Sequence, residues 1–283
     1  MRKQHKILDH AIISYFLLMI FASIFFSFGS YLDLALSSFI PGYASGIIVV
    51  AGREIPNASG IGVAIMAVIV LGIFKIWFRP DYEGCLKTKG LKTGLLMLLP
   101  FLLLHYAGSI VSWLSLGTSS VLIAFLRAFA PGFGEEVMFR GIGIANFMRV
   151  IKSEKQISVI FWLSSIVFGL SHIANIMGGG DPFSVLIQSV YAIGVGMLFG
   201  AVYLRTGSLW PCILAHMSVD FMELIRADLG ASGGLMMGMG LGDWITIVAA
   251  IFAAVWAIRL MNRKYYPEIV QIWRKKWNIS SAA

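Results

Sequence analysis

Three short motifs place acidic, basic and imidazole side chains inside hydrophobic stretches of the chain. In order, they contribute Glu135, Glu136, Arg140, His172, His216 and Asp220. An ionisable side chain in hydrocarbon is costly unless it faces a polar interior and finds a partner there. Carboxylates and imidazoles in such an interior serve as general bases or as metal ligands. The sequence therefore predicts an active site within a hydrophobic bundle.

The first motif contains adjacent acids with different expected roles. Glu136 and Arg140 are four residues apart, so on a helix they share one face and can pair. Glu135 points about 100° away and is the candidate general base or metal ligand. The acids follow Pro131-Gly132, which predicts a break in the helix. The structural alternative is a buried ion pair beside a carboxylate at the cytoplasmic edge.

The second and third motifs supply the histidines. His172 follows Phe168 by four residues, and alone it is more typical of a capped or interfacial histidine. His216 and Asp220 are also four residues apart, so the carboxylate can fix the tautomer of the imidazole. The alternative for this pair is a hydrogen bond that only stabilises the helix. Together, such residues from three helices are typical of a site inside a bundle.

Composition indicates a membrane protein. Of 283 residues, 58% are hydrophobic and 13% are charged, whereas soluble domains carry about 25% charged residues. The net charge is +8. Its Lys and Arg lie mainly in short loops, which predicts membrane orientation and not nucleic-acid binding. Cys85 and Cys212 give no disulfide framework.

The predicted fold class is all-α: a polytopic membrane helix bundle in one transmembrane domain, 1–283, with a catalytic core at about 119–228. About eight transmembrane helices are expected, at 11–29, 60–78, 93–116, 119–145, 157–177, 183–204, 208–228 and 244–261. The segment 31–50 is apolar but broken, and we expect an interfacial or re-entrant piece there.

The distribution of basic residues predicts that the N- and C-termini are both cytoplasmic. The segment 148–158 is charged enough to lie at the cytoplasmic surface, so the fifth helix is expected to begin near Phe161. With that start, the three motifs meet in the inner half of the membrane. The cavity should then open to the cytoplasm or sideways into the inner leaflet.

Other protease motifs do not fit. Residues 240–243 match the GxGD of intramembrane aspartyl proteases, but the Tyr-Asp pair which that class also needs is absent from the sequence. The sequence contains no H-E-x-x-H, which argues against the zinc site-2 type, and no G-x-S-x-G or similar serine motif with a suitable partner, which argues against a rhomboid.

The ordered motifs EExxxR at 135–140, FxxxH at 168–172 and HxxxD at 216–220 resemble those of the CPBP family. This family comprises CAAX proteases and bacteriocin-processing enzymes, also called Abi, and the likeness covers about 130–221. Eukaryotic type II CAAX prenyl endopeptidases end the last motif in Asn, where this chain has Asp220. An Asp can orient His216 or bind metal, but it donates a hydrogen bond only when protonated.

The resemblance implies an intramembrane endopeptidase. By analogy with the family, Glu135 and His172 would activate a water, while His216 and Asp220 would face the oxyanion. The supporting residues would be Glu136, Arg140 and Phe168.

The family is often described as metalloproteases. The sequence allows zinc or another divalent metal held by Glu135, His172 and His216. It equally allows a metal-free mechanism in which a glutamate activates the water.

The implied partners are membrane lipid and a peptide or protein substrate, in a multi-pass protein of a bacterial cell membrane. A secreted peptide, a bacteriocin precursor or a membrane-anchored regulator fits such a host better than a prenylated protein. The substrate, its prenylation and the oligomeric state stay open. Two rival functions are a non-catalytic bacteriocin-immunity or peptide-export partner and a proton-coupled transporter. The transporter would predict paired repeats, which the sequence lacks.

Overall fold

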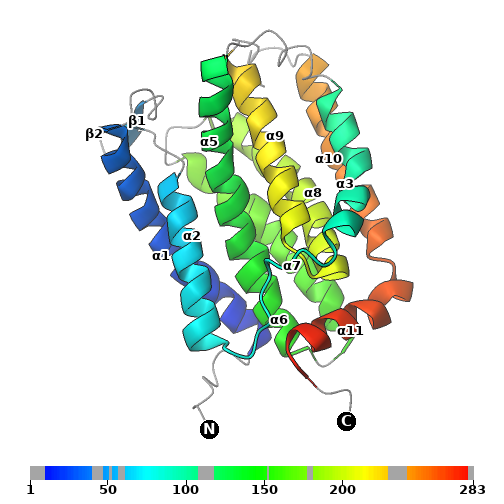
Figure 1. Cartoon of the computed structure of the whole chain (residues 1–283). Helices are drawn as coiled ribbons and strands as arrows, with labels where there is room; N and C mark the ends of the chain where they lie inside the picture. Colours follow the sequence, from blue (N-terminus) through cyan, green and yellow to red (C-terminus); the bar gives the residue numbers. More distant parts are fainter. Residues whose placement is uncertain are drawn as a thin grey trace.

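The computed structural model describes residues 10–39, 47–50, 53–56, 61–107, 118–151, 153–176, 181–228 and 241–279. Its long helices stand side by side as a bundle, and α11 lies across one end (Figure 1). The elements are α1 (Ala11–Ser37), β1 (Ile47–Val50), β2 (Arg53–Pro56), α2 (Ile61–Ile73), η2 (Phe74–Phe78), α3 (Leu91–Tyr106), α5 (Thr118–Glu136), η3 (Val137–Ile144), α6 (Ala145–Arg149), α7 (Lys155–Ser171), η4 (His172–Ile176), α8 (Pro182–Thr206), α9 (Trp210–Asp228), α10 (Leu241–Leu260), η5 (Arg263–Tyr265) and α11 (Tyr266–Lys276).

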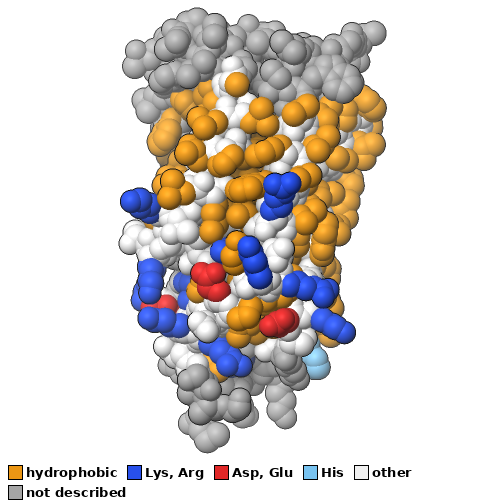
Figure 2. Space-filling model, turned by 90° about the vertical axis from the view of Figure 1, so that its right-hand side faces the viewer, with side chains coloured by type: hydrophobic (Ala, Val, Ile, Leu, Met, Phe, Trp, Pro, Cys, Tyr) orange, Lys and Arg blue, Asp and Glu red, His pale blue; other side chains and the backbone are white. Residues whose placement is uncertain are grey.

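The chain is an integral membrane protein by its apolar helices. In the described part of the chain, four helices are long and apolar enough to cross a membrane, namely Ala11–Leu36, Ile61–Phe78, Lys155–Ile176 and Pro182–Thr206. Shorter apolar helices cover Leu91–Tyr106 and Ile247–Leu260. In the described part of the face in Figure 2, hydrophobic side chains form a band above most of the Lys and Arg side chains. The predicted helical bundle is confirmed, while the count of about eight spans stays a prediction.

The bundle is held by helix pairs that approach closely. α5 packs mainly against α9, α7 against α8, α8 against α10, and α1 against α2. Glycines allow these approaches: a Cβ on Gly132 of α5 would lie 2.7 Å from the backbone nitrogen of Met217 in α9. A Cβ on Gly169 of α7 would lie 2.6 Å from the carbonyl oxygen of Ser189 in α8. Small residues at crossings are typical of packing between membrane helices.

The predicted break at Pro131-Gly132 is wrong, because α5 continues through Pro131 to Glu136. The departure from α-helical geometry comes later, where η3 is a π-helix over Val137–Ile144 and all eight residues are buried. A π-helical turn is wider than an α-helical turn and is often found at functional sites.

The segment 31–50 is divided between two elements. α1 continues through Ser37, beyond the predicted helix end at 29. Its Asp33 is buried and accepts a hydrogen bond of 2.7 Å from the backbone nitrogen of Gly62 at the start of α2. Downstream, β1 pairs antiparallel with β2, with Ile47 opposite Pro56. The β-branched run Ile-Ile-Val-Val favours a strand, so this hairpin is added to the all-α prediction.

The predicted start of the fifth helix near Phe161 is also wrong, since α7 begins at Lys155. His172 follows 17 residues later, about 26 Å along the axis at 1.5 Å per residue. The helix can begin at a charged residue because the Lys155 side chain is exposed and does not have to be buried.

The amphipathic helix α11 closes one end of the bundle. The indole nitrogens of Trp273 and Trp277 donate to the carbonyl oxygens of Leu204 and Ala145, at 3.0 and 3.1 Å. α1 also begins at this end (Figure 1). The described ends of the chain therefore share one end of the bundle, and the predicted cytoplasmic location of the termini stays a prediction.

We expect Gly132→Ala to destabilise the α5–α9 contact by about 1–3 kcal/mol, the usual cost of overpacking. The matched control is Gly72→Ala in α2, because no described atom lies within 4 Å of a Cβ there. Cys85 and Cys212 are buried, so a thiol-reactive dye reports thermal unfolding of the detergent-purified protein. An equal melting temperature for both variants would contradict the described packing of α5 on α9.

Candidate active site

A fully buried carboxylate joins the first and third motifs. Glu136 ends α5, and its Oε1 accepts a hydrogen bond from Arg140 in η3 at 2.8 Å. The same oxygen lies 3.0 Å from Nδ1 of His216 in α9. Glu136 and Arg140 are both 0% exposed. The predicted Glu136–Arg140 pair is confirmed, and one carboxylate oxygen thereby positions both a guanidinium and an imidazole.

The guanidinium of Arg140 has two further contacts besides Glu136, one from α7 and one from α8. It lies 4.2 Å from the ring centre of Phe168, a distance suited to a cation–π interaction. A second nitrogen donates to the carbonyl oxygen of Gly196 in α8 at 3.3 Å. A Cβ on Gly196 would come within 3.0 Å of the Phe168 ring and 3.3 Å of Arg140. The arginine therefore links η3, α7, α8 and α9 around Glu136.

The imidazole of His216 lies between three carboxylates. Its Nδ1 faces Glu136, whereas Nε2 lies 3.5 Å from Asp220 Oδ2 and 3.9 Å from Glu135 Oε2. The rings of Phe168 and Phe199 flank it, with centres 5.9 and 5.7 Å from the imidazole centre. An Nδ1–H that donates to Glu136 fixes the ring orientation and leaves Nε2 to the cavity side.

The second histidine has its tautomer set by the backbone. Nδ1 of His172 lies 2.9 Å from the carbonyl oxygen of Phe168. A carbonyl oxygen can only accept, so Nδ1 carries the hydrogen in this contact. In the neutral ring, Nε2 is then the nitrogen that can accept a proton. Phe168 also packs against the imidazole, with the ring centres 5.1 Å apart.

The four proposed catalytic side chains meet at one cavity of about 280 Å³, lined by Pro131, Glu135, Ser171, His172, Asn175, Gln188, His216 and Asp220. Glu136, Arg140 and Phe168 lie behind its wall. The Glu135 side chain is 30% exposed. Its Oε2 is nevertheless buried and has no hydrogen-bond partner among the described residues. The predicted convergence of Glu135, His172 and His216 is therefore present, while their catalytic roles stay predictions.

A larger neighbouring cavity of about 560 Å³ has mainly apolar walls, including Val185, Ile187, Ala192, Val195 and Val219. It shares His172, His216 and Asp220 with the smaller one. Its α8 residues lie between Ser184 and Val195, in the first half of that helix. α11 packs against the opposite end of α8, at Leu204.

Along α9, however, His216 lies only six residues, or about 9 Å, after Trp210, and this end of α9 follows Gly207 beside Lys276 of α11. The site therefore lies at an intermediate depth in the bundle. The predicted location in the inner half of the membrane assumed a helix start near Phe161, whereas α7 begins at Lys155. The predicted opening to the cytoplasm or sideways into the inner leaflet stays a prediction, as does the predicted orientation.

Two polar residues of the site were missed from the sequence. The side-chain amide of Asn175 in η4 donates to Oε1 of Gln188 in α8 at 3.0 Å, and both residues line both cavities. Gln188 could have been identified from the sequence, because it is an uncharged polar residue within an apolar stretch. Asn175 could not, since it lies near the end of a predicted helix.

The geometry does not match the predicted metal ligands. In the part of the chain that the structure describes, no group of three or more His, Cys, Asp or Glu side chains is placed to hold an ion. Both nitrogens of His216 already face carboxylates. A metal bound by Glu135, His172 and His216 would need Nε2 of His216 without its hydrogen, because a protonated nitrogen cannot be a ligand. The metal stays a prediction.

Residues 117–222 match the model of the family described as Type II CAAX prenyl endopeptidase Rce1-like. The matched segment contains all three motifs and every side chain of the smaller cavity. The predicted recognition is therefore confirmed over this segment. Comparisons with curated proteins and with solved structures gave no match.

We expect Arg140→Met to lower stability by about 3–5 kcal/mol, because it leaves the buried Glu136 carboxylate without a compensating charge. The double variant Arg140→Met/Glu136→Gln removes both charges and should recover much of that loss. Thermal unfolding, followed by labelling of the buried cysteines, compares the two variants. A double variant less stable than Arg140→Met would show that the charge pair is not what couples these residues.

Proposed function

We propose that the protein is an intramembrane endopeptidase that hydrolyses a peptide bond of a membrane-associated protein or peptide precursor. The family match supports a protease of the CAAX type. The observation that carries the proposal is the cavity where Glu135 meets His172, His216 and Asp220. Such a set can both activate water and stabilise negative charge, the two requirements of peptide hydrolysis.

Glu135 is the proposed general base. Its side chain is 30% exposed and lines the cavity, so its carboxylate can accept a proton from a water there. His172 has its hydrogen on Nδ1, so Nε2 can accept the other hydrogen bond of that water. As the oxygen of the water attacks the carbonyl carbon, Glu135 takes its proton. Glu135 then returns that proton to the leaving amine, so protons balance over the cycle.

His216 is the proposed hydrogen-bond donor to the substrate oxyanion. A hydrogen on Nε2 can point either to the Asp220 carboxylate at 3.5 Å or to a substrate oxyanion that forms in the cavity. Glu136 holds the opposite nitrogen, so the ring need not turn during the reaction. Preorganised donors of this kind stabilise a tetrahedral intermediate without a cost of reorganisation. Asp220 then orients His216 and favours its protonated form through charge.

The apolar cavity of about 560 Å³ suits an apolar part of the substrate. The family description names prenyl endopeptidases, so a lipid-modified C-terminal peptide is one substrate class. An unmodified peptide precursor is the other. We propose to compare both as fluorogenic peptides with the reconstituted protein. A non-catalytic immunity or export partner would cleave neither.

We expect Glu135→Gln to lower the cleavage rate by about 10²–10⁴-fold, the usual contribution of a general base. The amide keeps the size of the side chain but cannot take the proton. Its melting temperature should stay near that of the wild type, because Glu135 is partly exposed. Gln188→Glu, which keeps the size of another cavity residue, is the matched control. A folded Glu135→Gln protein with full activity would overturn the proposed base.

We expect Asp220→Asn to be milder than Asp220→Ala. The amide can still accept a hydrogen bond from His216, whereas Ala leaves that ring nitrogen without its neighbour at 3.5 Å. Cleavage rate and bound metal are measured on both variants and on the wild type. Equal loss of activity in the two variants, together with loss of a stoichiometric metal, would refute the orienting role and favour a metalloenzyme.

A further inference from the structure

A second cavity, far from the active site, is basic. It measures about 450 Å³ and lies between the loop after η2, the end of α8 and α11. Its basic residues are Lys87, Lys89, Arg205, Lys275 and Lys276, against which stand only Glu83 and Glu268. Figure 2 shows Lys and Arg gathered over the lower half of one face of the molecule. The cavity therefore carries an excess of three positive charges at one end of the bundle.

The arginine that lines this cavity, Arg205, has an unused donor. The Arg205 side chain is 9% exposed, and it lies 3.6 Å from the ring centre of Tyr265. It donates to the carbonyl oxygen of Leu260 at 3.0 Å and contacts Glu268 at 3.5 Å. Its Nε is buried and has no hydrogen-bond partner among the described residues. A buried guanidinium N–H without a partner is unfavourable unless an acceptor binds there.

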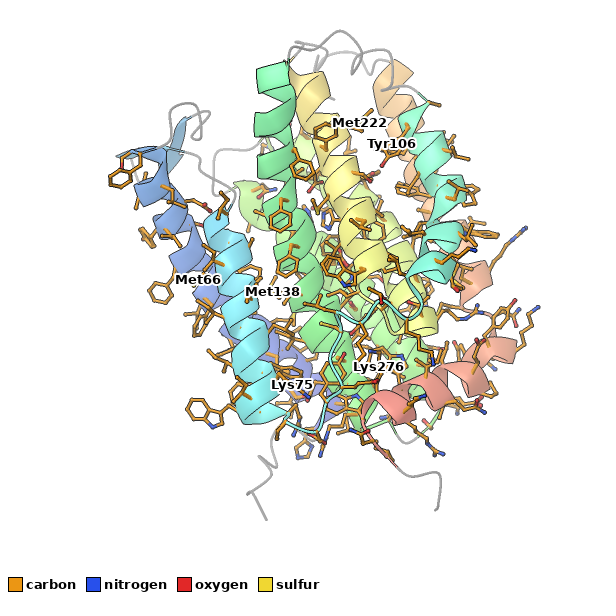
Figure 3. The ribbon with its side chains drawn as sticks, viewed as in Figure 1. Met66, Lys75, Tyr106, Met138, Met222 and Lys276 are labelled. Carbon is orange, nitrogen blue, oxygen red and sulfur yellow. The ribbon has the colours of Figure 1, made fainter. Side chains whose placement is uncertain are left out.

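Glu83 and Glu268 neutralise only part of the positive charge of this cavity. Glu83 pairs with Lys87, whose hydrogen bond lowers the pKa of the Glu83 carboxyl. Lys276, at the lower end of the bundle in Figure 3, donates to the carbonyl oxygen of Gly84 at 2.6 Å. Lys89 and Lys275 are exposed, with no ion pair in the described structure. They can therefore close on an anion without breaking an existing pair.

The start of α3 adds two features. The N–H of Leu91 already donates to the carbonyl oxygen of Thr88 at 2.9 Å, so of the first turn only the N–H groups of Lys92 and Thr93 can meet an anion. Gly90 has φ 93°, a left-handed conformation that favours glycine. An apolar groove of about 470 Å³ runs along α3 from Thr88 to Leu99; it shares no lining residue with the cavity, but its Thr88 lies between Lys87 and Lys89 of the cavity in the chain. Leu96 and Leu99 in this groove are 60% and 45% exposed.

We propose that this cavity binds the phosphate of an anionic phospholipid, with an acyl chain lying in the α3 groove. The basic cavity matches a phosphate, and the adjoining groove matches a hydrocarbon chain. The charge excess also lies at the membrane end where the predicted orientation places the cytoplasmic leaflet, which carries anionic lipid. A free phosphate would use the cavity but not the groove, so the two sources can be separated.

The test measures binding of fluorescent phosphatidylglycerol to the full chain in detergent micelles. Lys89→Gln/Lys275→Gln should weaken binding by about tenfold or more, since each lysine near an anionic lipid contributes about fivefold. The matched control is Lys155→Gln/Arg263→Gln, which removes two exposed charges that do not line the cavity. Leu96→Gln should also weaken binding, because it makes the groove polar.

Three results would overturn the proposal. Phosphatidylcholine could displace the probe as well as phosphatidylglycerol does, which would show no preference for an anionic headgroup. Inorganic phosphate could compete at equal concentration while Leu96→Gln has no effect, which would identify a free-anion site. Equal weakening in the cavity and control pairs would mean that general charge attraction explains the binding. Arg205→Gln, if it folds, should give a further loss.

Discussion

A buried carboxylate must be neutralised, and this requirement governs the centre of the protein. Glu136 is fully buried and shares one oxygen between Arg140 and His216. A charge without partners at this depth would unfold the site, so the helices that supply those partners must pack together. α5, η3, α8 and α9 meet around this ion pair, and Phe168 of α7 covers the guanidinium. The orientation of His216 in the cavity therefore depends on the buried Glu136 carboxylate, which does not line the cavity itself.

This arrangement divides two adjacent acids between two tasks. Glu136 points into the protein and holds Arg140 and His216, whereas Glu135 faces the cavity. The helix phase of about 100° between neighbours separates them. The same division explains why His216 has one nitrogen in the structural network and the other beside Asp220 and Glu135. The imidazole ring of His216 thus connects the supporting residue Glu136 to the proposed catalytic residues Glu135 and Asp220.

Much of this could be predicted from the sequence, because helix periodicity and burial are local properties. The i, i+4 spacing gave the Glu136–Arg140 pair, and the motif order gave the convergence of three helices. The partnership of Glu136 with His216 could not be predicted, because it depends on how α5 crosses α9 at Gly132. The course of the helix after Glu136 was missed for a related reason, since a π-helix depends on tertiary packing. The depth of His172 was misjudged because one helix start was placed six residues late.

Glu136 accepts a hydrogen bond from Nδ1–H of His216, and the carbonyl oxygen of Phe168 accepts one from Nδ1–H of His172. The whole site depends on these two contacts. Nitrogen NMR of the full chain in lipid, labelled with ¹⁵N at histidine, measures this directly. Signals are assigned by replacing each of the 5 histidines with Gln in turn. We expect Nδ1 to carry a hydrogen in both His172 and His216. A bare Nδ1 on His216 would contradict it, because the imidazole would then be an acceptor and Glu136 could not hold it as described.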